Sequence, residues 1–216
     1  MSREYRLQKL LKHPHIWRPG TAVVARRTVP TGFAVLDRRL GGGWPVEGLT
    51  ELLFSKQGIG ELRLLMPALA FLSRAGSPEE RQDVAAGDGG WIAWVAPPHI
   101  PYAPALGLYG VDTSRVLVIR PDKQADVLWA MEQALRSSTC VAVLAWLAAL
   151  DERSMRRLRL AAESGLCWAV IFRHLKFAHQ GSPAPLRIQL QPEDGQLGLD
   201  IIRNRYGAVG SLLLQC

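Results

Sequence analysis

The stretch that decides the fold is LTELLFSKQGIGEL, residues Leu49 to Leu62. Its first part, Leu49–Phe54, is a predicted strand, and a glycine-bearing turn and a helical pattern follow it. Apolar β-type runs then alternate with helical patterns along the chain, as in βαβ units with a parallel sheet covered on both faces. The expected strands are 49–54, 91–96, 116–120, 140–147 and 166–172, and the expected helices are about 60–74, 101–109, 122–137 and 151–164.

The pattern changes after Phe172. A loop rich in glycine, serine and proline, Gln180–Pro185, precedes three short alternating runs at 186–191, 198–203 and 211–214. Such runs are typical of antiparallel strands, here extending the edge of the sheet. Within the first helical pattern, Pro67 is expected to interrupt the helix. The predicted fold is α/β, with a mostly parallel sheet flanked by helices and an antiparallel C-terminal extension.

Length and composition fit one globular domain. The chain has 216 residues, 48% of them hydrophobic and 21% charged, and a formal net charge of +7. No apolar run approaches the ~20 residues of a membrane span, and the polar, basic N-terminus has no signal-peptide core. The three cysteines, Cys140, Cys167 and Cys216, match neither a disulfide framework nor a zinc spacing. We therefore expect a cytoplasmic protein without a bound metal and without membrane association.

Residues 1–28 hold +6 of the net charge of +7 and form a predicted basic N-terminal arm that precedes a domain at 29–216. This arm either remains solvated or binds a partner, including weak contact with DNA phosphates. Its candidate binding residues are Arg3, Arg6, Lys9, Lys12, Trp17 and Arg18.

The turn after the first strand occupies the position of a phosphate-binding P-loop. In the pattern G-x-x-x-x-G-K-[ST], backbone N–H groups and a lysine bind phosphates, and a hydroxyl holds magnesium. The corresponding residues are Ser55, Gly58, Gly60, Glu61 and Leu62, so that Glu61 replaces the lysine and Leu62 the hydroxyl. A carboxylate about 4 Å from a phosphate costs roughly 4 kcal/mol per charge pair at an effective dielectric near 20.

The segment 29–52, VPTGFAVLDRRLGGGWPVEGLTEL, resembles the lead-in to the RecA-like ATPase core. That superfamily has a T-G segment, an L-D pair, a glycine cluster and a P-x-x-G turn before its first core strand. The resemblance continues through Tyr109–Asp112 and Val141–Leu150, and Asn204–Gly207 is similar to a K-N-R-x-G turn of helicase-type members. It implies a RecA-like core over about residues 28–210.

The resemblance also implies two catalytic carboxylates, and neither is present. The acidic residue after the second core strand falls near Pro98, and the magnesium-linked aspartate falls near Ala145. Losing the lysine, the hydroxyl and both carboxylates removes nearly all of phosphoryl-transfer catalysis. We therefore expect no catalytic residue, no cofactor and no enzyme activity. An ATPase with an unconventional site stays as a minor alternative.

Reduced RecA-like cores of two kinds are similar to this chain, and both are associated with the bacterial response to DNA damage. ImuA-type proteins belong to a mutagenesis cassette for translesion synthesis, and SulA-type proteins inhibit cell division by binding FtsZ. The basic arm, the lead-in segment and the length favour the ImuA type. The preferred hypothesis is a non-catalytic adaptor in SOS mutagenesis that binds an ImuB-type polymerase relative and RecA. The alternative is a SulA-type inhibitor of FtsZ.

Further candidate binding residues lie in the second half of the chain. The sequence contains no pattern that determines the oligomeric state. A helix starting at Asp151 has a basic stripe of Arg153, Arg156 and Arg157, which is either a solvated face or a docking face. Two other places carry isolated cations. They are Lys176, at the place of a DNA-binding loop in RecA-like recombinases, and Arg203 and Arg205, at a C-terminal strand.

Overall fold

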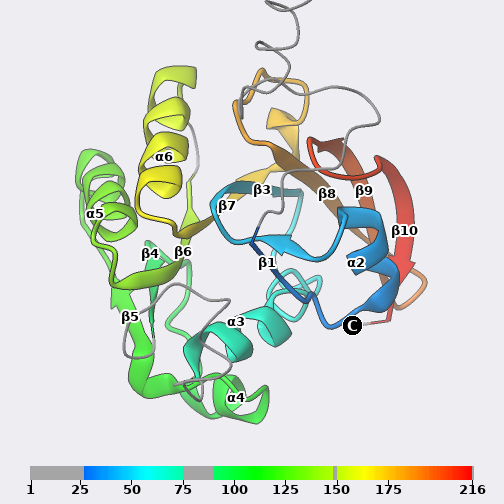
Figure 1. Ribbon diagram of the computed structural model, residues 1–216, viewed down its shortest axis with the longest axis horizontal. Helices are drawn as coiled ribbons and strands as arrows, with labels where there is room; N and C mark the ends of the chain where they lie inside the picture. Colours follow the sequence, from blue (N-terminus) through cyan, green and yellow to red (C-terminus); the bar gives the residue numbers. More distant parts are fainter. Residues whose placement is uncertain (1–26, 75–89, 148–149, 216) are drawn as a thin grey trace, which may run out of the picture.

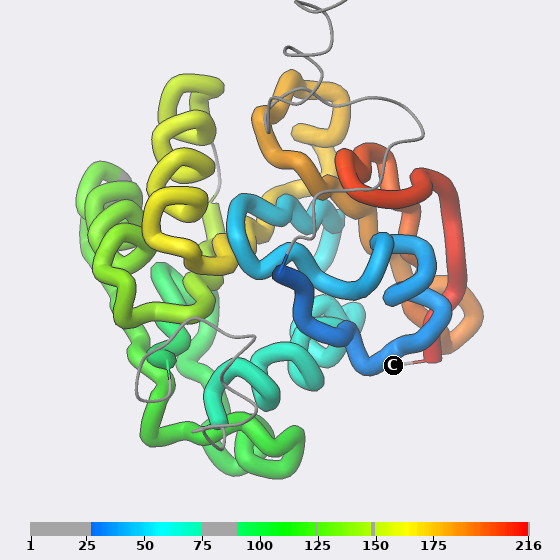
Figure 2. Tube along the Cα trace, viewed as in Figure 1, coloured from blue at the N-terminus to red at the C-terminus, as the bar shows by residue number. Residues whose placement is uncertain are grey.

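The computed structural model describes residues 27–74, 90–147 and 150–215. Strands and helices alternate through most of this part of the chain (Figures 1 and 2). The helices are α2 (Ala34–Leu40), α3 (Met66–Ser73), α4 (Ala103–Leu108), α5 (Gln124–Arg136) and α6 (Glu152–Ser164), with short 3-10 turns η2 (Thr113–Arg115) and η3 (Leu175–Phe177). The strands are β1 (Thr28–Val29), β2 (Trp44–Pro45), β3 (Gly48–Phe54), β4 (Trp91–Val95), β5 (Val116–Ile119), β6 (Cys140–Trp146), β7 (Trp168–His174), β8 (Leu186–Glu193), β9 (Gln196–Asn204) and β10 (Gly210–Leu214).

One eight-stranded sheet organises the molecule, in the order β10-β9-β8-β3-β7-β6-β4-β5. The six strands from β8 to β5 are parallel to one another, whereas β9 runs antiparallel to both β8 and β10. The fold is therefore mixed α/β with a mostly parallel sheet, and the antiparallel C-terminal extension is confirmed.

Each face of the sheet has its own core. Leu52 and Phe54 of β3 point to the face covered by α2, α3 and α4, where Trp168 also packs. Leu49 points to the other face, against the apolar sides of α5 and α6. Figure 1 shows α5 and α6 together on one side of the sheet. Because side chains alternate along a strand, Glu51 lies on the α5 and α6 face.

The expected strands and helices are present with shifted ends, and the largest shift is in the first helix. It was expected from about residue 60, but α3 begins at Met66 after a series of turns. Pro67 stands in the first turn of α3, where a missing N–H breaks no helical hydrogen bond. The prediction that Pro67 interrupts the helix was wrong for this reason.

The lead-in segment forms elements that the sequence pattern did not predict, namely α2 and the small sheet of β1 and β2. Its motif residues support one another, because the carboxylate of Asp37 accepts a hydrogen bond from the N–H of Thr31 at 2.8 Å. The distant Asn204–Gly207 turn docks here, and the Asn204 side-chain amide donates to the carbonyl of Arg39 at 3.2 Å. A β-carbon on Gly207 would lie 2.5 Å from that carbonyl oxygen, so this contact requires glycine.

Candidate functional site

The loop after β3 is closed by its own side chain. The Glu61 carboxylate accepts hydrogen bonds from the backbone N–H groups of Gly58 and Ile59, each at 3.0 Å. Gly58 and Gly60 have φ of +80° and +106°, which favours glycine at both positions. These two N–H groups belong to the loop whose amides cradle phosphates in a P-loop, and here the carboxylate occupies them. Glu61 is 5% exposed, whereas Ser55 stands in solvent.

Pro98 and Ala145, the two positions at which the RecA-like resemblance implies carboxylates, lie after β4 and within β6. Ala145 is fully buried and pairs in register with Val95 of β4, whereas Pro98 is exposed in the loop that follows. Aromatic rings occupy this end of the sheet on the face covered by α2, α3 and α4. Trp146 stacks on Phe172 at a centroid distance of 4.5 Å, and further rings continue the row, with Trp94 5.4 Å from Trp146 and Phe54 6.0 Å from Phe172.

This aromatic row fills the part of an open α/β sheet where ligands ordinarily bind, beside the carboxyl ends of the strands. Its four rings come from four neighbouring strands, β4, β6, β7 and β3. The arrangement provides packing and supplies no acid, base or metal ligand.

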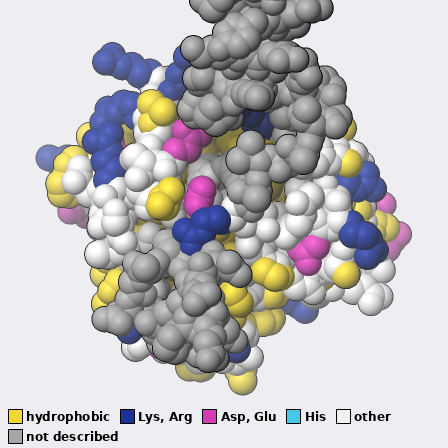
Figure 3. All heavy atoms as spheres, viewed as in Figure 1, with side chains coloured by type: hydrophobic (Ala, Val, Ile, Leu, Met, Phe, Trp, Pro, Cys, Tyr) yellow, Lys and Arg dark blue, Asp and Glu magenta, His cyan; other side chains and the backbone are white. Residues whose placement is uncertain are grey.

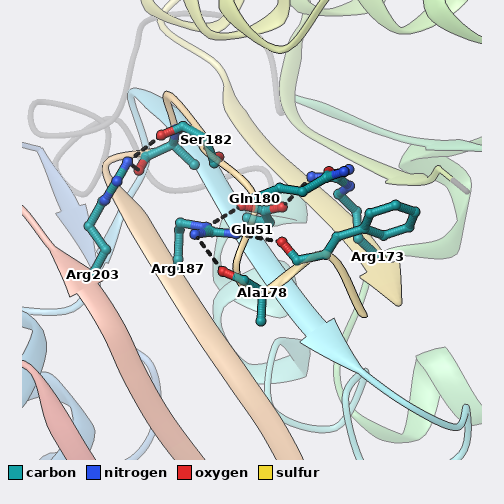
Figure 4. A network of polar contacts seen from close by, with 9 residues as sticks. Glu51, Arg173, Ala178, Gln180, Ser182, Arg187 and Arg203 are labelled. Atoms are coloured by element: carbon teal, nitrogen blue, oxygen red, sulfur yellow. Dashed lines mark hydrogen bonds and ion pairs between the residues drawn. The ribbon is translucent and has the colours of Figure 1, made fainter. Parts of the chain in front are cut away.

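A buried ionic cluster lies on the opposite face, where Glu51 of β3 meets two arginines (Figure 4). Arg173 of β7 donates to its Oε1 at 2.7 Å, and Arg187 of β8 donates to its Oε2 at 2.6 Å. The Glu51 side chain has no exposed surface, and the arginine side chains are 1% and 6% exposed. Both carboxylate oxygens are thereby satisfied, as a buried carboxylate requires.

The cluster holds the loop that joins β7 to β8. Arg187 donates to the carbonyls of Phe177 and Ala178, both at 3.1 Å, and Arg173 donates to the side chain of Gln180 at 3.2 Å. This connection has only η3 as regular structure, so it has no amphipathic helix to cover the sheet. Arginine donors instead satisfy loop carbonyls that would otherwise be buried without partners.

Two of the predicted cationic residues belong to this loop region. Lys176 is exposed, with its Nζ 5.1 Å from the centroid of the Phe177 ring, and the Arg173 guanidinium lies 4.4 Å from the same ring. Arg203 of β9 donates to the carbonyl of Ser182, as Figure 4 shows. Arg203 therefore fixes the loop, whereas Lys176 presents its charge to solvent.

The predicted arginine stripe on α6 exists, and most of it is paired. Arg156 bridges Glu152 at 2.5 Å, and Arg157 bridges Glu132 of α5. Arg153 is exposed and forms no ion pair among the described residues. Lys and Arg side chains gather over the α5 and α6 side of the surface in Figure 3. The surface is basic, but its charge is partly neutralised.

The remaining predicted residues are dispersed or lie outside the described part of the chain. Arg205 is exposed just after the end of β9, and Arg3, Arg6, Lys9, Lys12, Trp17 and Arg18 all lie outside the described residues.

Within residues 27–74, 90–147 and 150–215, no group of three His, Cys, Asp or Glu side chains is placed to hold a metal, and no helix is long and apolar enough to cross a membrane. Burial raises the pKa of the thiols of Cys140 and Cys167.

Sequence reasoning missed the Glu51 cluster and the aromatic row. A glutamate inside an otherwise apolar strand was an available signal for the first, since a buried charge needs a partner. The partners themselves are more than a hundred residues away in the chain, and no periodicity links them to Glu51.

Comparison with known proteins points to one family. The family model "Cell division inhibitor SulA" matches residues 81–169. A SulA protein of Edwardsiella piscicida is 36% identical over 75 residues, which are 35% of this chain and 45% of that protein. A SulA protein of Yersinia enterocolitica is 28% identical over 142 residues, which are 65% of this chain and 77% of that protein. The first of these matches thus spans less than half of the relative's length.

A solved structure of SulA from Pseudomonas aeruginosa is 27% identical, with a TM-score of 0.45, and covers 58% of this chain and 97% of that one. The relation to SulA therefore rests on the sequence matches.

These matches contradict the preferred hypothesis of an ImuA-type adaptor in translesion synthesis. The features that favoured it were the basic arm, the lead-in segment at 29–52 and the length, and the first two precede the matched residues 81–169. The lead-in forms α2 and holds the Asn204–Gly207 turn, so the contacts of its residues serve the fold and do not indicate a function. The partners expected for an ImuA-type adaptor, an ImuB-type protein and RecA, lose their support together with that hypothesis. The chain is similar to the SulA cell division inhibitors.

Proposed function

We propose that this protein is a SulA-type cell division inhibitor that binds FtsZ and blocks its polymerisation. The observation that carries the proposal is the match of residues 81–169 to the SulA family model, supported by curated SulA relatives. The matched range extends from before β4 to the start of β7 and so includes α4, β5, α5 and α6.

The geometry of the loop after β3 supports action by binding alone. Glu61 occupies the two N–H groups that a phosphate would need, and an aromatic row fills the neighbouring end of the sheet. A triphosphate at this loop would have to displace a carboxylate of its own charge sign. An inhibitor that works by occupying a surface of its partner needs no such site.

The core is RecA-like, which the docking of the Asn204–Gly207 turn on the lead-in segment supports. The chain divides into an arm at 1–28 and a domain at 29–216. The protein acts in the cytoplasm, and it acts during the SOS response, the bacterial response to DNA damage with which SulA-type inhibitors are associated. Of the exposed predicted cations, Arg156, Arg157 and Arg203 are held by ion pairs or a hydrogen bond, so Arg153, Lys176 and Arg205 are the ones best placed to contact a partner.

The test is an assembly assay with purified FtsZ and GTP, in which polymer is measured by sedimentation. We expect the full chain to reduce polymer in proportion to its amount, with complete inhibition near equimolar protein, because a binding inhibitor titrates its target. The control is the same chain after thermal unfolding. Unchanged polymer at a molar excess of folded protein would contradict the proposal.

A parallel ATPase measurement separates binding from catalysis. We expect no turnover above the buffer rate, with or without FtsZ, since the lysine, hydroxyl and carboxylate positions are Glu61, Leu62, Pro98 and Ala145. Turnover that a substitution in residues 55–62 abolishes would establish an ATPase instead.

A further inference from the structure

Two buried thiols lie on adjacent strands, at the start of β6 and just before β7. Ala142 of β6 pairs in register with Trp168 of β7. Cys140 stands two residues before the first of these, and Cys167 stands one residue before the second. Neighbouring strands are about 4.8 Å apart and rise about 3.3 Å per residue, which puts the two α-carbons roughly 6 Å apart. A disulfide can span that separation.

An irregularity in β6 turns both cysteine side chains to the same face of the sheet. Between Trp91 and Ile92 of β4, the paired strand β6 advances by two residues, from Cys140 to Ala142. A bulge of this kind shifts the alternation of side chains by one residue. Cys140 and Cys167 therefore share the core under α5 and α6, whereas Ala142 belongs to the core on the opposite face.

The two thiols differ in their access to solvent. Cys140 is 7% exposed and follows an exposed turn in which the hydroxyl oxygens of Ser137 and Thr139 lie 2.8 Å apart, whereas Cys167 has no exposed surface. Burial raises the pKa of both thiols, and the nearby Cys140 thiolate raises the pKa of Cys167 further. Hydrogen bonds from Ser137 and Thr139 act in the opposite direction at Cys140. An oxidant in solvent therefore reaches Cys140 first.

We propose that Cys140 and Cys167 form a redox-sensitive pair, which a hydroperoxide converts into a reversible disulfide that ties β6 to β7. In the first step the Cys140 sulfur attacks hydrogen peroxide, the O–O bond breaks, and sulfenic acid and water form. In the second step the Cys167 sulfur attacks the sulfenic sulfur, the S–O bond breaks, and the disulfide and a second water form. The two thiols lose two electrons, which reduce the peroxide. This inference goes beyond the proposed function and does not rest on it, because every readout uses this chain alone.

The first test identifies the bond. The full chain with Cys216→Ser, which removes the third thiol of the sequence, is reduced, desalted and treated with hydrogen peroxide at about pH 8.5, since the thiolate is the nucleophile. Free thiols are then blocked with N-ethylmaleimide, and a tryptic digest is analysed by mass spectrometry. We expect residues 137–153 and 160–173 as one disulfide-linked species that dithiothreitol separates. Free thiols at both positions, or links between molecules only, would overturn the inference.

A matched variant tests the geometry of the pair. Cys140→Ala combined with Val141→Cys moves the thiol by one residue, to a side chain that packs against the opposite core. We expect at least about tenfold less linked species than in the chain with Cys140, because the sheet separates the two thiols in this variant. Equal yields in both chains would show that the bond forms without the native arrangement and would overturn the inference.

A trapping experiment with dimedone, which reacts with sulfenic acids, tests the order of the two steps. In Cys167→Ala the sulfenic acid on Cys140 has no resolving thiol and should be trapped, whereas Cys140→Ala should give at least about tenfold less adduct because Cys167 is buried. Equal labelling of both variants would overturn this order. If either variant does not fold, dimedone present during oxidation of the chain with both cysteines decides the order. It should then modify Cys140 in preference to Cys167.

The last test asks whether the disulfide stabilises the fold. It would close a loop of residues 140–167, which contains α6, and a cross-link lowers the entropy of the unfolded chain. We expect the midpoint of urea unfolding to rise by about 1 M on oxidation and to return with dithiothreitol. Cys167→Ala treated with the same peroxide is the control and should show no rise. An unchanged midpoint in the cross-linked chain would overturn the disulfide as a tie between β6 and β7.

Discussion

Glu51 and Glu61 lie ten residues apart on either side of the turn after β3, and both are buried. Glu51 is neutralised by two guanidinium groups from neighbouring strands, whereas Glu61 is held by two backbone N–H groups of its own loop. The first carboxylate joins three strands and a long connection, and the second closes a single turn. A carboxylate bound by arginines of neighbouring strands therefore joins those strands, whereas one bound by backbone N–H groups closes its own loop. We call the contacts of Glu51 with Arg173 and Arg187 the clamp, and those of Glu61 with Gly58 and Ile59 the plug.

The strongest test of the comparison removes the clamp. Glu51→Ala leaves Arg173 and Arg187 buried beside each other without a counter-charge, and we expect a loss of about 3–5 kcal/mol in the free energy of unfolding. Urea denaturation followed by tryptophan fluorescence measures it. Glu163→Ala, which breaks the partly exposed pair with Arg159, is the control and should cost less than about 1 kcal/mol.

Replacing the whole cluster sharpens this result. Glu51→Leu combined with Arg173→Met and Arg187→Met should recover only part of the loss, since an apolar trio needs no counter-charge but leaves the carbonyls of Phe177 and Ala178 without the donors of Arg187. A single Glu51→Ala that costs no more than Glu163→Ala would show that the clamp contributes little to stability.

Removal of the plug should have a smaller effect and a ligand signature. Glu61→Ala frees the N–H groups of Gly58 and Ile59, and we expect a loss of about 1–2 kcal/mol. Inorganic phosphate should then raise the melting temperature of the variant, because an anion that binds the folded state alone stabilises it. The wild type should not respond, and an equal response in both proteins would show that Glu61 does not close the loop.

The buried thiol of Cys167, which has no charged partner among the described residues, makes the stability of the fold depend on pH. Burial raises the pKa of the Cys167 thiol well above its ordinary value of 9.0, so the thiol stays protonated in the folded chain when the unfolded chain ionises. Its stabilising contribution is present below about pH 9 and is lost as the pH rises further, by up to about 1.4 kcal/mol per pH unit.

Denaturation at pH 7 and pH 10, compared between the wild type and Cys167→Ala, isolates this effect. The wild type should lose about 1 kcal/mol more than the variant over that interval. Equal losses in both proteins would mean that the thiol ionises as readily in the folded chain as in the unfolded one.

The smallest effect concerns the arginines of α6. The Glu132 side chain, which Arg157 bridges, is 10% exposed, whereas Glu152, the partner of Arg156, is 59% exposed. We expect Arg157→Ala to destabilise by about 0.5–1 kcal/mol and Arg156→Ala by less than about 0.5 kcal/mol. Thermal unfolding of both variants at low and high salt measures the difference, and the reverse order would contradict the assignment of Arg157 as the residue that joins α5 and α6.

The sequence predicted the alternation of strands and helices well because periodicity is a local property. Five parallel strands and the antiparallel extension stand close to their expected positions. The helix before Arg74 was expected too early, because the apolar spacing at 60–65 also fits a series of turns. The candidate site was predicted only at the P-loop position, where glycine spacing is itself a local signal. The choice of ImuA over SulA failed because it rested on the length and on two features that precede residues 81–169, the basic arm and the lead-in segment.

By itself, the sequence determined the α/β class and the glycine-bearing turn after the first predicted strand, since each depends on residue types at neighbouring or regularly spaced positions. Only the tertiary structure decided what the charged residues do. Glu51 meets Arg173 and Arg187 because β3 lies between β7 and β8, an order that no run of residues encodes locally. The same sheet order places β5 at the edge of the sheet among the described residues, because hydrogen bonding between strands joins residues that are distant in the chain.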